Sequence, residues 1–310
     1  MLVQDRLGTP PKLTATVARE YVHRAALADV FLTGWEATAK DTFRVTAQWP
    51  RSHGFYEWEH GLYDPLLLCE TFRQTFPLLN HAEYGVPFGH QLFWHQLQYT
   101  LDPREMAITS APAEIELLIT CSDIRLRRGI PTEMSMSVAV LRDGRQVATA
   151  STRIGILAPA VYQRLRATRA DLQHVFGSAP LPPPPISRRL VGRSRHQDVV
   201  LAQTPHAGRW KLRADTSHPV LFDHAVDHAP GMLLLEAVRQ AGLAVQPAGQ
   251  HMMPTSMDVA FVQYVEFDSP CWIEAHPAPG PTDAPQRRVR IEAIQEGRVM
   301  LTAAATLTGV

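Results

Sequence analysis

The sequence has few cysteines, no excess of charge and no long apolar run. Its three cysteines, Cys69, Cys121 and Cys271, are odd in number and far apart, which argues against a disulfide framework or a CxxC metal site and favours a reducing compartment. The 30 basic and 30 acidic residues give a formal net charge of zero, so the basic excess of a nucleic-acid-binding protein is missing. No stretch approaches the roughly 18 uncharged apolar residues of a membrane span, and the N-terminus lacks the pattern of a secretion signal. We therefore expect a cytoplasmic protein that binds neither nucleic acid nor membrane.

The sequence motifs of several enzyme classes are missing as well. There is no GxSxG around a nucleophilic serine, and neither GxGxxG nor GxxxxGK[ST] occurs, so the usual support for a covalent acyl-enzyme or a nucleotide-binding enzyme is lacking. What the chain does have is apolar material: 45% of its 310 residues are hydrophobic, enough for one large or two ordinary domains.

A proline-rich segment divides the chain. Residues 178–189 read SAPLPPPPISRR, and the four prolines at 182–185 predict a stiff polyproline II spacer. We predict an N-terminal domain over residues 1–157, a linker over residues 158–192 and a C-terminal domain over residues 193–310.

The two halves repeat one another in the same order. Four elements are shared. They are an Asp-Val segment (residues 29–32 and 198–201), the pattern LLxExxRQ (67–74 and 233–240), a Gln-Tyr pair (98–99 and 263–264) and an acidic-Gly-Arg turn (143–145 and 296–298). A period of roughly 160 residues is too long for a solenoid repeat. The pattern therefore predicts a duplicated domain with two similar sites.

Each copy is predicted to hold one helix and several strands. Asp64 and Pro65 form a good helix start, and Pro230 opens the second helix, which is apolar nearly all round over residues 232–241 and must be buried. Strand-like segments with tight turns follow each helix. This order predicts an α+β fold in which an antiparallel sheet curls around a long helix, the hotdog arrangement, with two copies forming a pseudo-dimer in one chain. A further dimer of chains is optional.

An acid and a base recur three residues apart on both helices. Glu236 and Arg239 lie on the most apolar helix, and Glu70 and Arg73 repeat them. One interpretation is a structural ion pair at helical spacing. The other is functional: a half-buried carboxylate with a raised pKa acts as a general base, while the arginine holds a phosphate or polarises a carbonyl oxygen.

The segment before the second helix, residues 218–231, contains three histidines and two aspartates. Its histidine spacings match no common zinc pattern, so we expect no metal. Two interpretations remain: a hydrogen-bonded loop in which Asp227 or His228 caps the helix, or an active-site loop that places a histidine near Glu236. The first copy offers only His60 and Asp64 in the corresponding region.

Residues 228–240 resemble the signature of hydroxyacyl-ACP dehydratases, in which a Pro-Gly dipeptide opens the central hotdog helix and an acid follows six residues after the proline. Pro230 and Glu236 keep that spacing. The dehydratase histidine would fall at Phe222, which moves that role to His224 or His228.

A set of motifs spread over both halves resembles the A-factor biosynthesis (AfsA-like) double-hotdog proteins. The motifs occupy residues 22–24, 29–33, 47–51, 64–74, 86–89 and 227–240. The resemblance implies an acyltransferase that moves a β-ketoacyl group from an acyl carrier protein or CoA thioester to the hydroxyl of dihydroxyacetone phosphate. That ester leads to γ-butyrolactone, butenolide or furan signalling molecules. No cofactor is implied beyond the phosphopantetheine that carries the substrate.

Roles carried over from this resemblance fall on the two helices and the histidine loop. One of the glutamates, Glu236 or Glu70, is expected to deprotonate the acceptor hydroxyl, and Arg239 or Arg73 is expected to steer a phosphate. The helix N-terminus at Gly231 is expected to polarise the thioester carbonyl. The predicted substrate-binding set is completed by His224, His228 and Gln240. Glu236→Gln is expected to abolish turnover while the fold stays intact.

Two other functions remain open from the sequence. One is a different acyl-thioester hotdog enzyme, a thioesterase or a dehydratase. The other is a non-catalytic protein that binds an acyl group or lactone and regulates transcription through partners.

Overall fold

The structure is a computed structural model that describes residues 14–57, 60–247, 250–281 and 284–310. The N-terminal half contains β1 (Leu32–Ala39), β2 (Thr42–Trp49), α1 (Pro65–Ala82), β3 (Gln91–Leu101), β4 (Ala113–Arg127), β5 (Ile130–Arg142) and β6 (Arg145–Leu157). The C-terminal half contains β7 (Leu201–Ala202), β8 (Arg209–Leu212), α4 (Gly231–Ala244), β9 (Met252–Phe261), β10 (Cys271–Pro277), β11 (Gln286–Gln295) and β12 (Arg298–Gly309). Two short helices, α2 (Pro159–Arg166) and α3 (Leu172–Gly177), lie between the halves.

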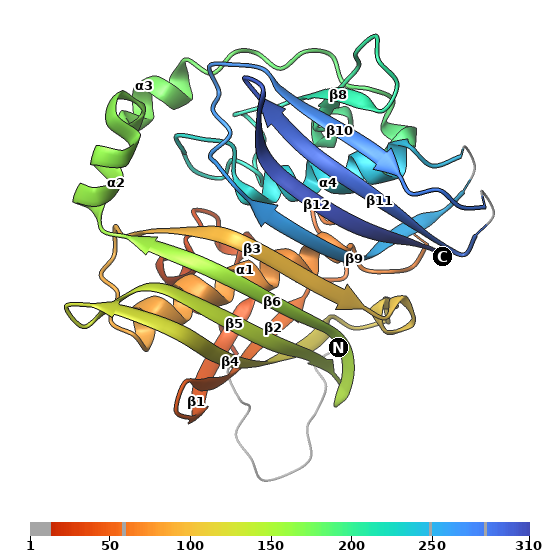
Figure 1. The fold of residues 1–310 in the computed structure, drawn as a ribbon. Helices are drawn as coiled ribbons and strands as arrows, with labels where there is room; N and C mark the ends of the chain where they lie inside the picture. Colours follow the sequence, from red (N-terminus) through yellow and green to blue (C-terminus); the bar gives the residue numbers. More distant parts are fainter. Residues whose placement is uncertain (1–13, 58–59, 248–249, 282–283) are drawn as a thin grey trace.

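The strands form one 12-stranded sheet in the order β1-β2-β4-β5-β6-β3-β9-β12-β11-β10-β8-β7. Read from either end, this order gives the same succession of equivalent strands, so the two halves are related by an approximate twofold axis. The halves join where β3 pairs antiparallel with β9, from Gln96 opposite Ala260 to Thr100 opposite Ser256. Figure 1 shows each half of the sheet curled over its own helix, α1 below and α4 above. The predicted double hotdog is confirmed.

The central helices begin where the sequence predicts. Pro65 is the first residue of α1, and the Asp64 carboxylate accepts a hydrogen bond from the Leu66 amide at 2.8 Å. Pro230 directly precedes α4, and no side chain accepts a hydrogen bond from the first amides of this helix. All residues of α4 from position 232 to 242 are buried, as expected of a helix that is apolar nearly all round. The apolar side chains of both helices and of the inner sheet face belong to one continuous core.

The hairpin turns repeat as closely as the helices. Asp143 and Gly144 have φ of 52° and 73°, and Glu296 and Gly297 have the same two values. A two-residue hairpin turn with positive φ at both positions matches the twist of the flanking strands, and a glycine takes the second position without strain. Both turns that the sequence predicts are therefore confirmed.

The segment between the halves is more than a spacer. Its proline run forms no helix, and Pro185 makes a single bridge to Ala202. The part before the prolines folds into α2 and α3, and the Arg166 side chain of α2 is buried against the C-terminal half. This segment is therefore not only a linker, because the amphipathic helix α2 packs on the C-terminal half through its buried arginine.

The three cysteines are free thiols and are all buried. No helix among the described residues is long and apolar enough to cross a membrane.

Candidate active site

Glu236 lies at the centre of a buried network on α4. Its side chain has no exposed area. The carboxylate accepts hydrogen bonds from Arg193 Nε and Nη2 at 2.8 and 2.6 Å, and from Arg239 Nε and Nη2 at 2.9 Å each. Gln240 donates a fifth hydrogen bond at 2.5 Å. Every position at which this carboxylate could accept a proton or contact a substrate is thus taken by a donor of the protein.

The same network is repeated around Glu70 on α1. Arg24 and Arg73 replace Arg193 and Arg239, with nitrogen to oxygen distances of 2.7 to 2.9 Å. Gln74 donates to Glu70 at 2.8 Å and to the Asp29 carbonyl at 2.7 Å, just as Gln240 donates to the Asp198 carbonyl at 2.8 Å. The duplication has therefore preserved a whole hydrogen-bonded network as well as the pattern of the helices.

The environment of these glutamates corrects one expectation. Burial alone would raise the pKa of each carboxyl, but the two arginines beside it outweigh that effect and hold the pKa of both Glu70 and Glu236 at about 2. The expectation of a half-buried glutamate with a raised pKa is wrong, because both carboxylates are fully buried and each is paired twice. The geometry is that of a structural ion pair.

Each network also crosses to the other half of the chain. Arg193 Nη1 donates to the Phe55 carbonyl at 2.8 Å and contacts Asp64, the cap of α1, at 3.1 Å. In the twofold-related arrangement, Arg24 Nη1 donates to the Val220 carbonyl at 3.0 Å and contacts Asp223 at 3.5 Å. The loop that precedes one central helix is thus fixed by the glutamate network of the other helix.

This crossing corrects a second expectation. Asp223 accepts from the Ala25 amide at 2.9 Å and binds Arg24, so the adjacent His224 lies beside the Glu70 network. One of the two interpretations of this loop placed a histidine near Glu236. His224 does not lie there, because the approximate twofold axis places this part of the loop against α1. His218 of the same loop binds Asp198, whose carbonyl accepts from Gln240 of the Glu236 network.

The histidine loop contains two carboxylate-held histidines. His224 Nδ1 donates to Asp223 at 2.5 Å, and His228 Nδ1 donates to Asp227 at 2.6 Å. A carboxylate on Nδ1 fixes the tautomer and leaves Nε2 as the nitrogen that can accept a proton. The side chains are 50% and 26% exposed, so both rings are accessible. The repeated Asp-His dipeptides in the segment DHAVDH produce this pair of dyads.

The Asp227–His228 dyad is held from α2. Tyr162 donates its hydroxyl hydrogen to Asp227 at 2.7 Å, and Arg166 Nε donates to the same carboxylate at 2.9 Å. Arg166 also pairs with Glu266 at 2.6 Å and lies over the Tyr264 ring at 4.6 Å. Burial would raise the pKa of Asp227, but the hydrogen bonds from His228 and Tyr162 and the charge of Arg166 hold it well below its usual range. Asp227 therefore stays ionised beside the histidine.

The start of α4 lies three residues after His228. Gly231 packs directly on the indole of Trp94, and a Cβ atom at this position would lie 2.5 Å from that ring. No side chain accepts a hydrogen bond from the first amides of α4, whereas Asp64 accepts from an amide at the start of α1. The structure thus brings the predicted residues Gly231 and His228 to one end of one helix.

A second group of basic side chains lies on the N-terminal half beside His224. His81 Nδ1 donates to the Val86 carbonyl at 2.7 Å, which leaves its Nε2 to accept a hydrogen bond from His23 at 2.8 Å. Burial lowers the pKa of His23 to about 3, assisted by the charges of Arg73, His81 and His224. This group brings together Arg73 and His224, two of the predicted binding residues.

Several residues of the site were missed by the sequence analysis. Arg24 and Arg193 had a signal, because the repeat extends upstream as VxRx4DVxL, at residues 22–32 and 191–201. His53 and His218 also correspond, since each binds an aspartate of that motif, Asp29 at 3.2 Å and Asp198 at 3.0 Å. Tyr162 and Arg166 had no signal, because they lie in the segment read as a linker.

A cavity of about 170 Å³ lies between the proline-rich segment and the connection from β9 to β10. Its lining includes Leu212, Ala214, Ala229, Val265 and Phe267. Ala229 is the residue after His228, although neither member of the dyad lines the cavity. Among the residues that the structure describes, no group of three or more His, Cys, Asp and Glu side chains is arranged to hold a metal ion.

Comparison with known proteins adds to this geometry. Residues 8–158 and 178–310 match the model of the A-factor biosynthesis hotdog domain. The chain is 46% identical over 284 residues to a 2-oxo-3-(phosphooxy)propyl 3-oxoalkanoate synthase of Streptomyces virginiae, covering 92% of this chain and 95% of that protein. A protein of the same name from Streptomyces coelicolor is 40% identical over 291 residues, covering 93% and 90%. The fold is similar to that of the 12:0-ACP thioesterase from Umbellularia californica, with a TM-score of 0.53, 11% identity and coverage of 89% of this chain and 100% of that chain.

Proposed function

Since the chain belongs to the A-factor biosynthesis hotdog family, we propose that it is an acyltransferase that moves a 3-oxoacyl group from a thioester to the hydroxyl of dihydroxyacetone phosphate. The relatives are named for making a 2-oxo-3-(phosphooxy)propyl 3-oxoalkanoate, which is the ester this transfer yields. One observation carries the assignment to this site: the Asp227–His228 dyad stands before the uncapped start of α4.

His228 is the proposed general base. Its Nε2 takes the proton from the acceptor hydroxyl, and the oxygen attacks the thioester carbonyl while Asp227 stabilises the imidazolium. The carbonyl oxygen becomes negative in the tetrahedral intermediate and receives hydrogen bonds from amides at the start of α4, beginning at Gly231. When the carbon–sulfur bond breaks, the thiolate leaves and takes the proton back from His228. The products are the ester and the free thiol.

The acceptor phosphate is assigned to the basic group on the N-terminal half. Arg73 is 17% exposed and lies near His23 and His224, so guanidinium and imidazole N–H groups gather there as donors for a phosphate. Glu70 holds Arg73 and Arg24 in place. The twofold-related network consists of Glu236, Arg239 and Gln240. In this proposal it acts indirectly, by holding the first turn of α1 in position.

The donor is a phosphopantetheine thioester, carried by an acyl carrier protein or CoA. The thioester is already activated, so the transfer needs no other cofactor. The cavity beside Ala229 is the proposed place for the acyl chain, because it is lined largely by apolar side chains and Ala229 directly follows His228 in the chain.

Mass spectrometry of the purified protein with a 3-oxoacyl carrier-protein thioester, with and without dihydroxyacetone phosphate, tests the function. Formation of the phosphorylated ester only when both substrates are present is expected. Free acid in place of the ester would contradict the proposal in favour of a thioesterase. Unchanged thioester would contradict it in favour of a binding protein.

A further inference from the structure

Six exposed side chains gather beside α2, and we refer to them as the rim: Phe88, Leu126, Arg127, Arg128, Arg164 and Leu165. Leu126 and Leu165 are each 62% exposed and Phe88 is 58% exposed. Large apolar side chains that are this exposed and lie next to arginines are typical of protein interaction surfaces.

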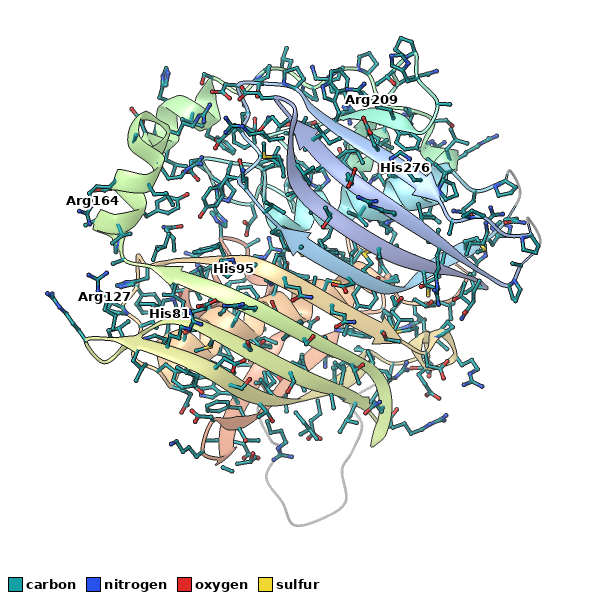
Figure 2. The ribbon with its side chains drawn as sticks, in the orientation of Figure 1. His81, His95, Arg127, Arg164, Arg209 and His276 are labelled. Atoms are coloured by element: carbon teal, nitrogen blue, oxygen red, sulfur yellow. The ribbon has the colours of Figure 1, made fainter. Side chains whose placement is uncertain are left out.

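Strand register brings the parts of the rim together. Glu133 of β5 pairs with Gly155 near the end of β6, so the β4–β5 hairpin tip at Arg127 and Ile130 projects beyond that end, where α2 begins. The loop after Phe88 approaches the same point, because a Cβ atom at Gly89 would lie 3.8 Å from Pro159. Figure 2 shows Arg127 and Arg164 on the same side of the molecule.

The rim is also positively charged. Two neighbouring arginines, Arg125 and Arg153, share one acidic partner, Glu133. Within the part of the chain that the structure describes, Arg127, Arg128 and Arg164 pair with no acidic side chain. Three uncompensated guanidinium groups therefore face solvent beside three apolar side chains.

The rim borders the candidate active site from two sides. The ring of Phe88 stacks on His81 at 4.5 Å, and His81 binds His23 of the basic group. Helix α2 presents Arg164 and Leu165 outward, while Tyr162 and Arg166 of the same helix hold the Asp227–His228 dyad. A partner seated on the rim would thus rest a short distance from the dyad.

We propose that the rim is the docking surface for an acidic carrier protein that presents the acyl thioester to the dyad. The cargo assigned to this partner rests on the proposed function, whereas the surface itself is argued from charge and position. An acidic partner complements the three free arginines, and its apolar contact residues would cover Phe88, Leu126 and Leu165. A free CoA thioester has phosphates for arginines to bind, but it has no apolar surface to cover Phe88, Leu126 and Leu165.

Charge reversal tests the docking surface. In Arg127→Glu/Arg128→Glu, KM for a 3-oxoacyl acyl carrier protein is expected to rise about tenfold or more, because attractive charges become repulsive. KM for the same acyl group on pantetheine should stay within about twofold, since the small donor does not touch the rim. The matched control is Arg288→Glu/Arg298→Glu, which makes the same charge change on β11 and β12 and should alter neither value. A carrier KM that is unchanged, or a rise for both donors, would overturn the proposal.

Direct binding separates this proposal from the proposed function. Calorimetric titration of the wild-type protein with the acyl carrier protein should give a Kd that weakens with added salt and weakens about tenfold in Arg127→Glu/Arg128→Glu. Equal binding by wild type and variant overturns the docking surface even if acyl transfer occurs. Binding that depends on Arg127 and Arg128 without any transfer supports the surface and contradicts the function.

Discussion

The two copies of the hotdog domain share one buried network and differ in the loop that precedes the central helix. Glu70 and Glu236 have equivalent arginine and glutamine partners. At the same distance before each glutamate, however, the second copy has Asp227–His228 and the first has Gly61–Leu62. Duplication has thus kept the residues that hold the halves together, whereas the Asp-His dipeptide stands at this spacing only in the sequence of the second copy.

The two central helices also differ at their N-termini. The start of α1 is closed by Asp64, which caps the helix and also binds Arg193. The space beside it is only about 30 Å³. The start of α4 has no side-chain cap, and Ala229, two residues before the helix, lines a larger cavity. The comparison indicates one active end and one structural end, and the following variants test that division.

The largest difference is expected for histidines at the two ends. His228→Ala should lower kcat by about 10² to 10⁴, because it removes the proposed general base. His60→Ala, in the loop before α1, should change kcat less than about twofold, since no proposed step uses it. Steady-state rates of ester formation measure both, with thermal unfolding as the control for folding. Equal losses of kcat in the two variants would contradict a single active end.

The next effect concerns stability and should be the same in both copies. Arg24→Ala and Arg193→Ala each leave a buried glutamate with one arginine fewer and should lower the free energy of unfolding by about 3 to 5 kcal/mol. Urea unfolding measures this change. Arg298→Ala, on the exposed end of β12, should cost less than about 0.5 kcal/mol. A large loss in only one of the two buried variants would show that the networks are not equivalent.

Acid should unfold the protein through the same two glutamates. Their folded pKa of about 2 lies below the ordinary value of 4.5, so their stabilisation is present above pH 4.5 and is lost as the pH falls towards 2. Each contributes on the order of 3 kcal/mol at neutral pH. Glu236→Gln should therefore reduce the slope of stability against pH in this range, measured by urea unfolding at several pH values.

Glu236→Gln also distinguishes the two interpretations of that residue. A catalytic base predicts lost turnover with an intact fold. A structural ion pair predicts that activity and stability fall together, and this second result is the one the geometry favours.

The smallest expected effect is at the first residue of each helix. Gly231→Ala places a methyl group against Trp94 and should cost about 1 to 3 kcal/mol, because the ring must move. Pro65→Ala, at the equivalent position of α1, should cost less than about 1 kcal/mol, since it mainly frees the unfolded chain. Thermal unfolding compares the two. A Gly231→Ala protein as stable as Pro65→Ala would show that close packing on Trp94 does not require glycine.

Local signals predicted much of this fold, and long-range packing decided the rest. Asp64, Pro65 and the two hairpin turns follow from neighbouring residues, and the repeat predicted two equivalent halves. The crossing of Arg24 to Asp223 joins residues nearly 200 positions apart, so no local pattern could indicate it. Tyr162 and Arg166 escaped for a similar reason: their partners, Asp227 and Glu266, lie far along the chain. For these contacts the sequence indicated residue types but not which residues meet.

The pairing of β3 with β9 has a consequence for how the site behaves on dilution. His228 comes from one half of the chain and Arg73 from the other, and the halves meet along this pair of strands. In a protein built from two separate chains, such a site would disappear at low concentration as the subunits dissociate. Because both halves here belong to one polypeptide, their effective concentration is fixed by the connection between them, and the complete site forms even when the enzyme is scarce.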